Sequence, residues 1–322
     1  MSSDSDALTC GRDAVDAAVA AGATQAEATV TIGDRFSVEA RDRTITKLEQ
    51  SRASSLHVRV FVDGRKATLA TTDFDRGRVR VAIGAAVAQA RHVADDTFGG
   101  LPSASRHDPL EESDLELYSQ DVVGRDAQSK IDEALALERL VREADPRIEN
   151  SNGSHYSDGA TITALANSLG FAGAYRSTRV SRASSPVARD GEAKRTGSYG
   201  TAARRLMELE SVEDVARKSA QRTVELIGAR KPQTARLPVI FERDVAGAVL
   251  SDLFAAISAS NVANGNSWLA DRLGETIGSS FVTITDDGTL PGLLGSSPFD
   301  GEGVQTQRTL VFERGTLRTL LY

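Results

Sequence analysis

The sequence feature that most restricts the possible folds is an alternating apolar run that leads directly into a tight turn. Apolar side chains occupy every second position from Leu56 to Val62, and Asp63-Gly64 follows immediately. A period of two places these side chains on one face of a strand, and an Asp-Gly pair favours a two-residue hairpin. The return strand is expected over Ala67–Thr71. We therefore expect this part of the chain to form an antiparallel sheet.

Further strands and amphipathic helices are predicted for the rest of the first 229 residues. Strands are expected at 28–32 and 36–40, separated by a Gly33-Asp34 turn. Helices are expected over residues 6–22, 79–93, 127–144 and 211–228. The last of these begins with Ser211 and Asp214, which resemble a capping box. The region 147–205 is predicted to be strand-like, with turns at Asn152-Gly153, Asp158-Gly159 and Asp190-Gly191.

The character of the sequence changes after residues 230–234, Arg-Lys-Pro-Gln-Thr, which are the best candidate for a linker. A strand is expected at Leu237–Phe241 and a helix at Val245–Ile257, followed by short strands and Gly-rich turns. The expected division is an N-terminal α+β domain at 1–229, the linker 230–234 and a β-rich C-terminal domain at 235–322. Helices and antiparallel strands without regular alternation predict the α+β class.

Composition and charge argue against several functional classes. A formal net charge of −7 argues against nucleic-acid binding through a general basic field. The single cysteine, Cys10, excludes disulfides within the chain and zinc sites built from thiolates. The first residues are acidic, unlike a secretory leader, and no apolar run approaches the roughly 20 residues that span a bilayer. We therefore expect a cytoplasmic protein that binds neither nucleic acid nor membrane.

Candidate catalytic side chains are few and widely spaced. The histidines are His57, His92, His107 and His155. No pair of them has the spacing of a metal site on a helix. The acids that could gather around Mg²⁺ or Ca²⁺ are Asp286, Asp287, Asp300 and Glu302. Their spacing matches no calcium-binding loop, so neither a catalytic residue nor a metal ligand is assigned to this chain.

A turn-rich segment from Ser297 to Arg308 precedes the apolar strand expected at Thr309–Phe312. Gly301 and Gly303 flank Glu302 and allow the backbone to bend or to approach another chain closely. One interpretation is a carboxylate site that handles a metal or a substrate. The other is a polar loop that only shapes a hairpin. The residues by themselves leave both interpretations open.

Several segments together resemble the TldD/PmbA family, and its PmbA (TldE) branch more than its TldD branch. The most specific segment is 296–308, which reads SSPFDGEGVQTQR. Supporting segments are 54–62, 70–74, 166–170 and 230–241. The resemblance implies a two-domain α+β fold with antiparallel sheets flanked by helices, followed by a β-rich metallopeptidase-like C-terminal domain. It also implies that this domain is incomplete, because family members continue past the hairpin at 316–322.

In that family, TldD-like and PmbA-like subunits form a zinc-dependent peptidase that cleaves unfolded or leader-bearing peptides through a metal-activated water. The TldD-like subunit carries an H-E-x-x-x-H helix. Here the corresponding helix begins Glu242-Arg243-Asp244, and no histidine follows His155. The resemblance therefore implies a subunit without a cofactor of its own, with zinc expected on a TldD-like partner.

Three functions are consistent with these observations. The first is the non-metal PmbA-like subunit, in which a groove or subunit-contact motif comprises Phe299, Asp300, Glu302, Gly303 and Arg308. The second is a non-catalytic peptide- or protein-binding regulator, to which the family's older label, modulator of DNA gyrase, belongs. The third is an independent hydrolase that uses the acidic cluster and a hard metal. The chain is also a candidate homo-oligomer.

Overall fold

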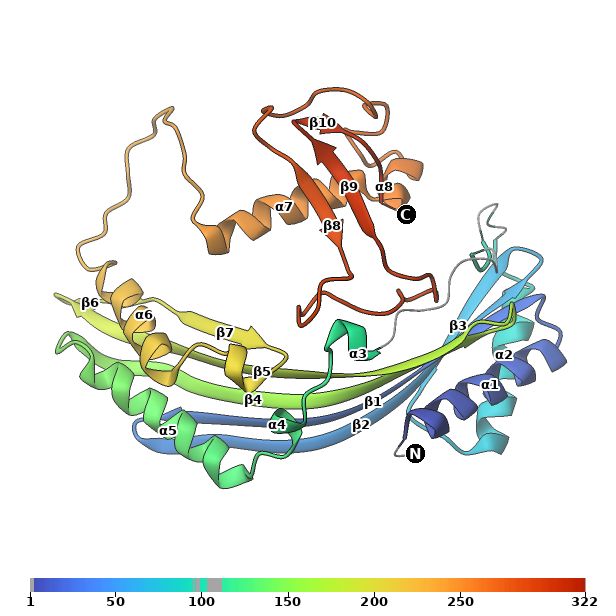
Figure 1. The fold of residues 1–322 in the computed structure, drawn as a ribbon, viewed down its shortest axis with the longest axis horizontal. Coiled ribbons are helices and arrows are strands. Elements are labelled where there is room, and N and C mark those ends of the chain that lie inside the picture. The colour runs from blue at the N-terminus through green and yellow to red at the C-terminus, as the bar shows by residue number, and fades with distance from the viewer. Residues whose placement is uncertain (1–2, 95, 97–98, 103–111, 322) are drawn as a thin grey trace. The chain divides into compact units, whose positions relative to one another are not determined.

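The computed structural model of the protein describes residues 3–94, 96, 99–102 and 112–321, and the structural statements below concern these residues. The contacts divide the chain into two compact units, drawn together in Figure 1. Unit 1 comprises Met1–Ala229 and Leu290–Thr306, and unit 2 comprises Arg230–Thr289 and Gln307–Tyr322. The segment 290–306 thus belongs to unit 1, although unit 2 supplies the residues on both sides of it. The domain boundaries expected from the sequence remain a prediction.

Unit 1 is built on a seven-stranded sheet with the order β3-β2-β1-β4-β5-β6, in which β7 also pairs with β5. Its strands are β1 (Gln25–Arg41), β2 (Thr44–Val62), β3 (Arg65–Thr71), β4 (Ile148–Asn167), β5 (Ala172–Asp190), β6 (Ala193–Thr196) and β7 (Tyr199–Ala203). Neighbouring strands pair antiparallel, and the longest ones curve visibly in Figure 1. The predicted hairpin is confirmed, because β2 and β3 pair on either side of Asp63-Gly64. The expected α+β class is confirmed as well.

Some expected turns lie inside continuous strands. β1 runs through Gly33-Asp34, and β4 runs through Asn152-Gly153 and Asp158-Gly159, so these three turn predictions are wrong. Gly33 pairs with Ala53 on one side and with Thr161 on the other. Neighbouring strands therefore supply backbone hydrogen bonds that outweigh the local preference for a turn. The turn at Asp190-Gly191 is confirmed, and Gly191 has a positive φ of 62°.

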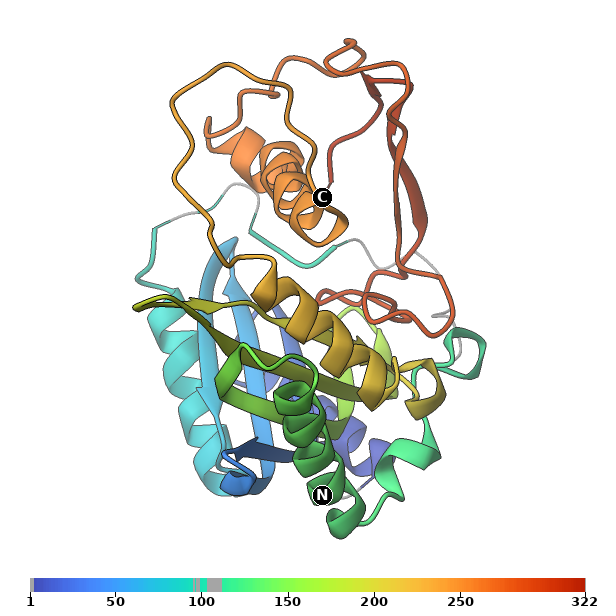
Figure 2. The same cartoon turned by 90° about the vertical axis from the view of Figure 1, so that its left-hand side faces the viewer.

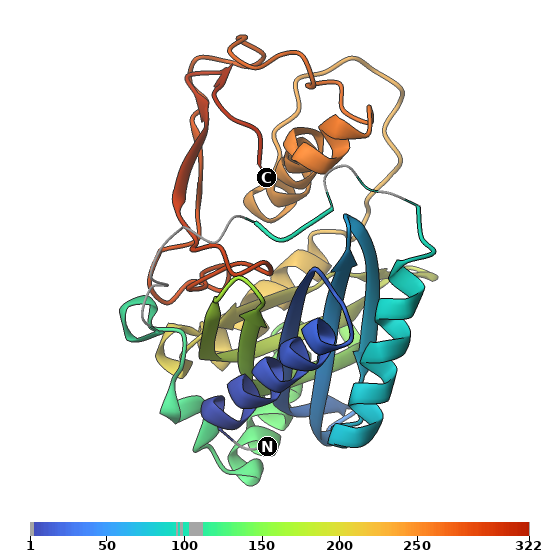
Figure 3. The same ribbon diagram turned by 90° about the vertical axis from the view of Figure 1, so that its right-hand side faces the viewer.

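Two groups of helices cover the same face of the sheet. The longer helices are α1 (Asp4–Ala20), α2 (Arg76–Ala90), α5 (Ala127–Glu143) and α6 (Val212–Val224). Val30 of β1 packs in one apolar cluster with residues of α1 and α2, and Val38 packs in a second cluster with Ala134 of α5. Residues an even number apart on a strand share a face, so both clusters lie on one side of β1. Figure 3 shows α1 and α2 against the strands, and Figure 2 shows α5 beside α6.

Short helical turns complete unit 1, and α6 begins as the sequence predicts. The short elements are α3 (Glu112–Leu115), α4 (Gln120–Val123) and a 3₁₀ turn at Leu206–Glu208. The Oγ of Ser211 accepts a hydrogen bond from the backbone N–H of Asp214 at 3.0 Å. This bond satisfies one of the free N–H groups of the first helical turn, so the N-terminal half of the capping box is confirmed.

Unit 2 has a small core between one helix and a three-stranded sheet. Its elements are α7 (Arg243–Ile257), α8 (Ala259–Ala263), β8 (Ile284–Asp287), β9 (Arg308–Glu313) and β10 (Thr316–Leu317), with the sheet order β10-β9-β8. The end of α7 packs on the sheet through Ile257, which clusters with Val311 and Phe312. The predicted strand at Leu237–Phe241 is wrong, because this segment has no regular secondary structure. A strand requires a neighbour, and none of the described residues pairs with it.

In the part of the chain that the structure describes, every helix is too short or too polar to cross a lipid bilayer.

Candidate functional site

The turn at Asp300 is stabilised by its own carboxylate. Oδ1 of Asp300 accepts hydrogen bonds from the N–H groups of Glu302 and Val304, both at 2.9 Å. The N–H of Asp300 donates to the carbonyl of Val304 at 2.8 Å. Tight turns are often stabilised by a side chain that accepts hydrogen bonds from backbone N–H groups a few residues later. The Asp300 carboxylate therefore has a structural role in the loop.

Phe299 anchors the loop in unit 1. Its side chain is buried, and its ring lies edge-on to Phe171 at 5.1 Å and to Tyr175 at 5.2 Å between centroids. Such edge-to-face contacts are favourable beyond the area that they bury. Gly173 of β5 leaves room for the ring, because a Cβ at that position would lie 2.8 Å from Phe299. Phe299 is thus an internal anchor and not an exposed contact residue.

Gly303 meets two requirements that favour glycine. Its φ is +79°, in the left-handed region that other residues rarely adopt. A Cβ at this position would approach the ring of Phe171 to 2.8 Å. Gly303 therefore permits a close approach within the chain, and the segment that it approaches is the loop after β4.

Arg59 joins the loop to the sheet through two carboxylates. Its Nη1 lies 3.0 Å from Oε1 of Glu302, and its Nε donates to Oε1 of Glu27 at 3.0 Å. Arg59 on β2 is directly opposite Glu27 on β1 in the strand register, so the two side chains share a face. Glu27 is 3% exposed, whereas the side chain of Glu302 is 48% exposed. One guanidinium therefore bridges a buried and a half-exposed acid.

The surroundings of Glu27 favour the protonated form of its carboxyl group more than bulk water does. Burial raises the pKa of Glu27 above its ordinary value, because the charged form loses hydration. Arg59 acts in the opposite direction, and the negative charges of Glu302 and Asp300 raise this pKa further. The site consequently holds more acidic groups than the single arginine neutralises.

Arg204, which directly follows β7, holds the residues that precede the loop. Its guanidinium donates to the carbonyls of Leu294 at 2.9 Å and of Leu293 and Ser296 at 3.4 Å. A further bond at 3.0 Å reaches the carbonyl of Thr178 on β5. Arg204 is buried, and burial lowers its pKa. The several N–H donors of one guanidinium thus bond several backbone carbonyls at once, which no other side chain can do.

The motif residues predicted from the sequence are divided between the two units. Phe299, Asp300, Glu302 and Gly303 lie together in unit 1. Arg308 begins β9 in unit 2, where its Nε lies 3.6 Å from Oδ2 of Asp287. The Arg308 side chain is 74% exposed. Among the predicted motif residues, only Glu302 and Arg308 are charged, have an exposed side chain and form an ion pair.

The side chains that the structure describes do not form a zinc site. Among the residues that the structure describes, no three histidine, cysteine, aspartate or glutamate side chains are placed to hold a metal. His155 faces Glu39, with 3.7 Å between Nδ1 and Oε2. His107 lies outside the described residues. Three of the acidic residues considered for a hard metal are engaged by their own chain: Asp300 by the loop backbone, Asp287 by Thr289, which donates to its Oδ1, and Glu302 by Arg59.

A second polar cluster, which the sequence reasoning missed, is buried under α5. Nζ of Lys130 lies 2.6 Å from Oδ2 of Asp158, and the hydroxyl of Tyr156 donates to the same oxygen at 2.7 Å. Burial and this hydrogen bond raise the pKa of Tyr156. The sequence predicts a turn at Asp158-Gly159, and no local pattern pairs Asp158 with a lysine on a helix. Because each of these groups is bonded to another, the cluster is best explained as a support for α5.

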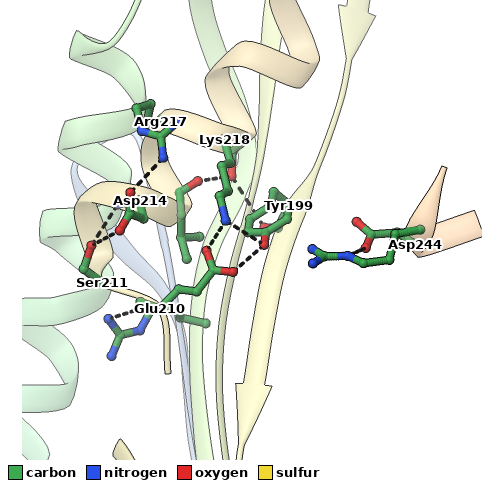
Figure 4. A network of polar contacts seen from close by, with 11 residues as sticks. Tyr199, Glu210, Ser211, Asp214, Arg217, Lys218 and Asp244 are labelled. Atoms are coloured by element: carbon green, nitrogen blue, oxygen red, sulfur yellow. Dashed lines mark hydrogen bonds and ion pairs between the residues drawn. The ribbon is translucent and has the colours of Figure 1, made fainter. Parts of the chain in front are cut away.

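A third cluster fastens α6 to β7 and is drawn in Figure 4. The Tyr199 hydroxyl donates to Oε1 of Glu210, and Nζ of Lys218 donates to Oε2, both at 2.6 Å. Lys218 also lies 3.2 Å from the Tyr199 hydroxyl. Figure 4 shows the three side chains pointing toward one another beside the Ser211 cap. The three side chains satisfy one another's hydrogen-bonding groups. This cluster is therefore also explained as a structural support, here for α6.

Family comparisons cover most of the chain. Three domain models of one family match in succession along it. They are the PmbA/TldA metallopeptidase domain 1 at residues 26–94, the central domain at 121–227 and the C-terminal domain at 234–322.

Related proteins include a metalloprotease PmbA homolog of Haemophilus influenzae, 32% identical over 96% of this chain and 67% of that protein. Metalloprotease PmbA of Escherichia coli O157:H7 is 30% identical over 91% of this chain and 64% of that protein. The chain spans about two thirds of the length of these curated relatives.

Solved structures of similar proteins show the same fold. One from Bacteroides thetaiotaomicron, whose name proposes it as a modulator of DNA gyrase, has a TM-score of 0.90 and 27% identity, covering 97% of this chain and 71% of that one. TldE of Thermococcus kodakarensis has a TM-score of 0.77 and 19% identity, covering 96% of this chain and 69% of that one. At that identity the second likeness concerns the fold alone.

Proposed function

The chain belongs to the PmbA/TldD metallopeptidase family, and from this premise we propose that it is the PmbA-like, non-metal subunit of a heteromeric zinc peptidase. One observation carries the proposal. The match to the metallopeptidase C-terminal domain spans residues 234–322, and this stretch contains no histidine. Zinc peptidase sites of the H-E-x-x-x-H type require histidine ligands. We therefore assign the metal to a TldD-like partner.

In this proposal a zinc ion bound by the TldD-like partner would supply the Lewis-acid chemistry of peptide hydrolysis. The contribution of this chain is to bind and orient an unfolded or leader-bearing peptide and to complete the assembly. Glu302 supports such a role, because Arg59 holds its carboxylate while 48% of the side chain remains exposed. Arg308 is a second candidate for a contact with the partner or the peptide, since its side chain is 74% exposed.

The remaining motif residues are proposed to position these contacts. Phe299 packs against Phe171 and Tyr175, and Gly303 permits the loop to approach Phe171. The Asp300 carboxylate fixes the backbone that carries Glu302. The loop would thereby present Glu302 in one orientation, which lowers the entropy cost of binding a partner.

A reconstitution experiment tests the proposal. The purified chain is mixed with a TldD-like subunit from the same genome, and hydrolysis of an unfolded peptide is measured with and without the chain. We expect the mixture to cleave the peptide faster than the TldD-like subunit does alone. Equal rates would sink the subunit hypothesis.

The Glu302→Ala variant tests the contact role of the loop. We expect weaker complex formation on a sizing column and unchanged zinc content in the TldD-like subunit. Glu192→Ala is the matched control, because Glu192 is an exposed glutamate on the β5–β6 hairpin that forms no ion pair with the described residues. Loss of zinc from the partner on replacing Glu302 would overturn the assignment of the metal site to that partner.

A second candidate function is a non-catalytic regulator that binds a protein or a peptide. Its support is that two similar structures carry names that propose a modulator of DNA gyrase, with TM-scores of 0.90 and 0.82. Affinity purification from native cells separates the two candidates. Recovery of a TldD-like subunit favours the peptidase, and recovery of gyrase without such a subunit favours the regulator.

A further inference from the structure

Unit 1 contains a cavity of about 470 Å³ between the start of α5 and the middle of the sheet. Its walls come from β1, β2 and β4 on one side and from α4 and the first turn of α5 on the other. This volume lies within the range of roughly 300–1,000 Å³ that is usual for small-ligand sites. None of the described residues that line the cavity belongs to the loop at 297–308, so it is a separate candidate for a binding site.

The charged residues that line the cavity are mainly basic. The cationic ones are Arg35, Arg52, Arg125 and Lys130, and the acidic ones are Asp34 and Asp158. Positive charge therefore exceeds negative charge in the lining, although the whole chain carries a formal net charge of −7. Asp126 adjoins Arg125 in sequence, but its carboxylate is bonded to Ser129 as the cap of α5. The lining consequently favours a ligand with negative charge.

The most deeply buried charges in the lining are those of Lys130 and Asp158, the pair that supports α5. The two residues are 7% and 6% exposed, and Nζ of Lys130 lies 2.9 Å from Oδ1 and 2.6 Å from Oδ2 of Asp158. The other neighbour of the ammonium group is the ring of Phe36, whose centroid is 4.8 Å from Nζ and which offers no oxygen acceptor. Because an ammonium group has three N–H donors, Lys130 retains capacity for an anionic ligand in the cavity.

A second excess of positive charge lies next to Arg125. Arg125 and Arg182 share the carboxylate of Glu133, with 2.5 Å between Nη1 of Arg125 and Oε2 and 2.8 Å between Nε of Arg182 and Oε1. Glu133 and Arg182 are both 8% exposed. One buried acid thus faces two guanidinium groups and can neutralise only one of them. Since buried charges are stable when opposite charges balance them, an anion in the adjacent cavity would stabilise this cluster.

We propose that this cavity binds a phosphate dianion, either free or as the phosphate group of a small molecule. A dianion matches the excess positive charge, and guanidinium groups bind phosphate oxygens through paired N–H donors. The walls also include the apolar side chains of Val123, which is 44% exposed, and Ala127. These side chains are placed to contact the organic part of a phosphate ester. The proposal concerns this chain by itself and goes beyond the peptidase role.

Isothermal titration calorimetry of the whole chain tests the proposal. Inorganic phosphate and phenyl phosphate are titrated separately, each with sodium chloride at the same ionic strength as the reference. We expect saturable binding at one site with a Kd of about 1 mM or lower. Tighter binding of phenyl phosphate identifies an organic phosphate as the preferred ligand, and equal or weaker binding identifies free phosphate. The absence of saturable binding for both anions would overturn the proposal.

Two neighbouring charges at the rim of the cavity locate the site. Arg52 and Asp34 form an ion pair at 3.6 Å, and both side chains are exposed, so either can be replaced without disturbing the core. Arg52→Gln should raise the phosphate Kd by about threefold, and Asp34→Asn should lower it by a similar factor. Lys47→Gln and Glu49→Gln are the matched controls, because these residues form an exposed ion pair on β2 outside the lining. The controls change the net charge by the same amounts and should leave the Kd unchanged.

Shifts in the same direction for Arg52→Gln and Asp34→Asn, or no shift in either, would show that phosphate does not bind in this cavity.

The buried ammonium group is tested by the double variant Lys130→Met/Asp158→Asn. It preserves the net charge and leaves neither member of the pair buried alone. We expect the phosphate Kd to rise by about tenfold or more, because a hydrogen bond to a charged donor is lost. Thermal denaturation establishes that the double variant is folded, and an unchanged Kd in the folded variant would contradict the proposal. The measurements use neither a TldD-like subunit nor a peptide, so their result is independent of the proposed peptidase role.

Discussion

Oε1 of Glu302 lies 3.0 Å from Nη1 of Arg59, although 243 residues separate the two in sequence. The same guanidinium is bonded to Glu27, which is 3% exposed. A single arginine on β2 therefore connects the motif 296–308 to the interior of the unit 1 sheet. The two acids that it contacts differ in burial, and this difference allows their contributions to be separated.

Replacing Arg59 with alanine should be far more damaging than replacing Glu302. Arg59→Ala leaves the Glu27 carboxylate buried without its counter-ion, which typically costs about 3–5 kcal/mol. Glu302→Ala removes a half-exposed partner and should cost about 0–1 kcal/mol. Urea denaturation of both variants at neutral pH measures the two free energies of unfolding. Similar losses for both variants would contradict the assigned difference in burial.

The pKa of Glu27 should make stability depend on pH. Burial raises this pKa in the folded chain above the ordinary value of 4.5. Between the unfolded and the folded pKa the folded protein binds more protons, so the free energy of unfolding falls as pH rises. The stability of the wild type relative to Glu27→Gln should therefore be highest below about pH 4 and decline through the folded pKa. Urea denaturation over a pH series measures this difference, and an increase with pH would show that the sign is wrong.

Arg204→Lys should loosen residues 290–296, which precede the loop. A lysine ammonium cannot reproduce the guanidinium fork that contacts the carbonyls of Leu293, Leu294 and Ser296. Leaving buried carbonyls without donors costs about 1–3 kcal/mol. We expect faster amide hydrogen exchange in 290–296, where the Gly292 N–H is bonded to the carbonyl of Leu115. Arg179→Lys, at an exposed arginine on β5, serves as control, and equal exchange in both variants would refute the anchoring role.

Two glycines of the loop should respond differently to alanine. Gly303→Ala introduces a Cβ at a φ of +79° and 2.8 Å from the Phe171 ring. Backbone strain of this kind costs about 1–3 kcal/mol. Gly301→Ala meets no atom within 4 Å and should change stability by less than about 0.5 kcal/mol. Thermal denaturation of the pair compares them, and equal melting temperatures would contradict the close approach.

Elements defined by a few neighbouring residues were predictable from the sequence. The hairpin at Asp63-Gly64 and the cap at Ser211 depend on side chains and turns within a few positions, and both are present. The turns expected at Gly33-Asp34 and Asp158-Gly159 are absent, because strands on both sides bond these backbones. A local preference is decisive only where no neighbouring strand competes for the same hydrogen bonds.

The candidate site was only partly predictable for the same reason. The motif 296–308 can be recognised from its residues alone, and Gly303 makes a close contact of the kind that glycine permits. Its partners Arg59, Arg204 and Phe171 come from strands and loops distant in sequence. Glu27 and Arg59 both occupy alternating strand positions, but only the register of β1 with β2 reveals that they are neighbours.

By itself, the sequence determined the α+β class, the resemblance to a metallopeptidase family and the lack of histidine after His155. Only the tertiary structure decided that residues 290–306 belong with unit 1 and that Leu237–Phe241 lies unpaired. The physical reason is the same in both cases. Helical and strand periodicity depends on residues a few positions apart, whereas an ion pair or a strand ladder depends on which distant segment supplies the partner.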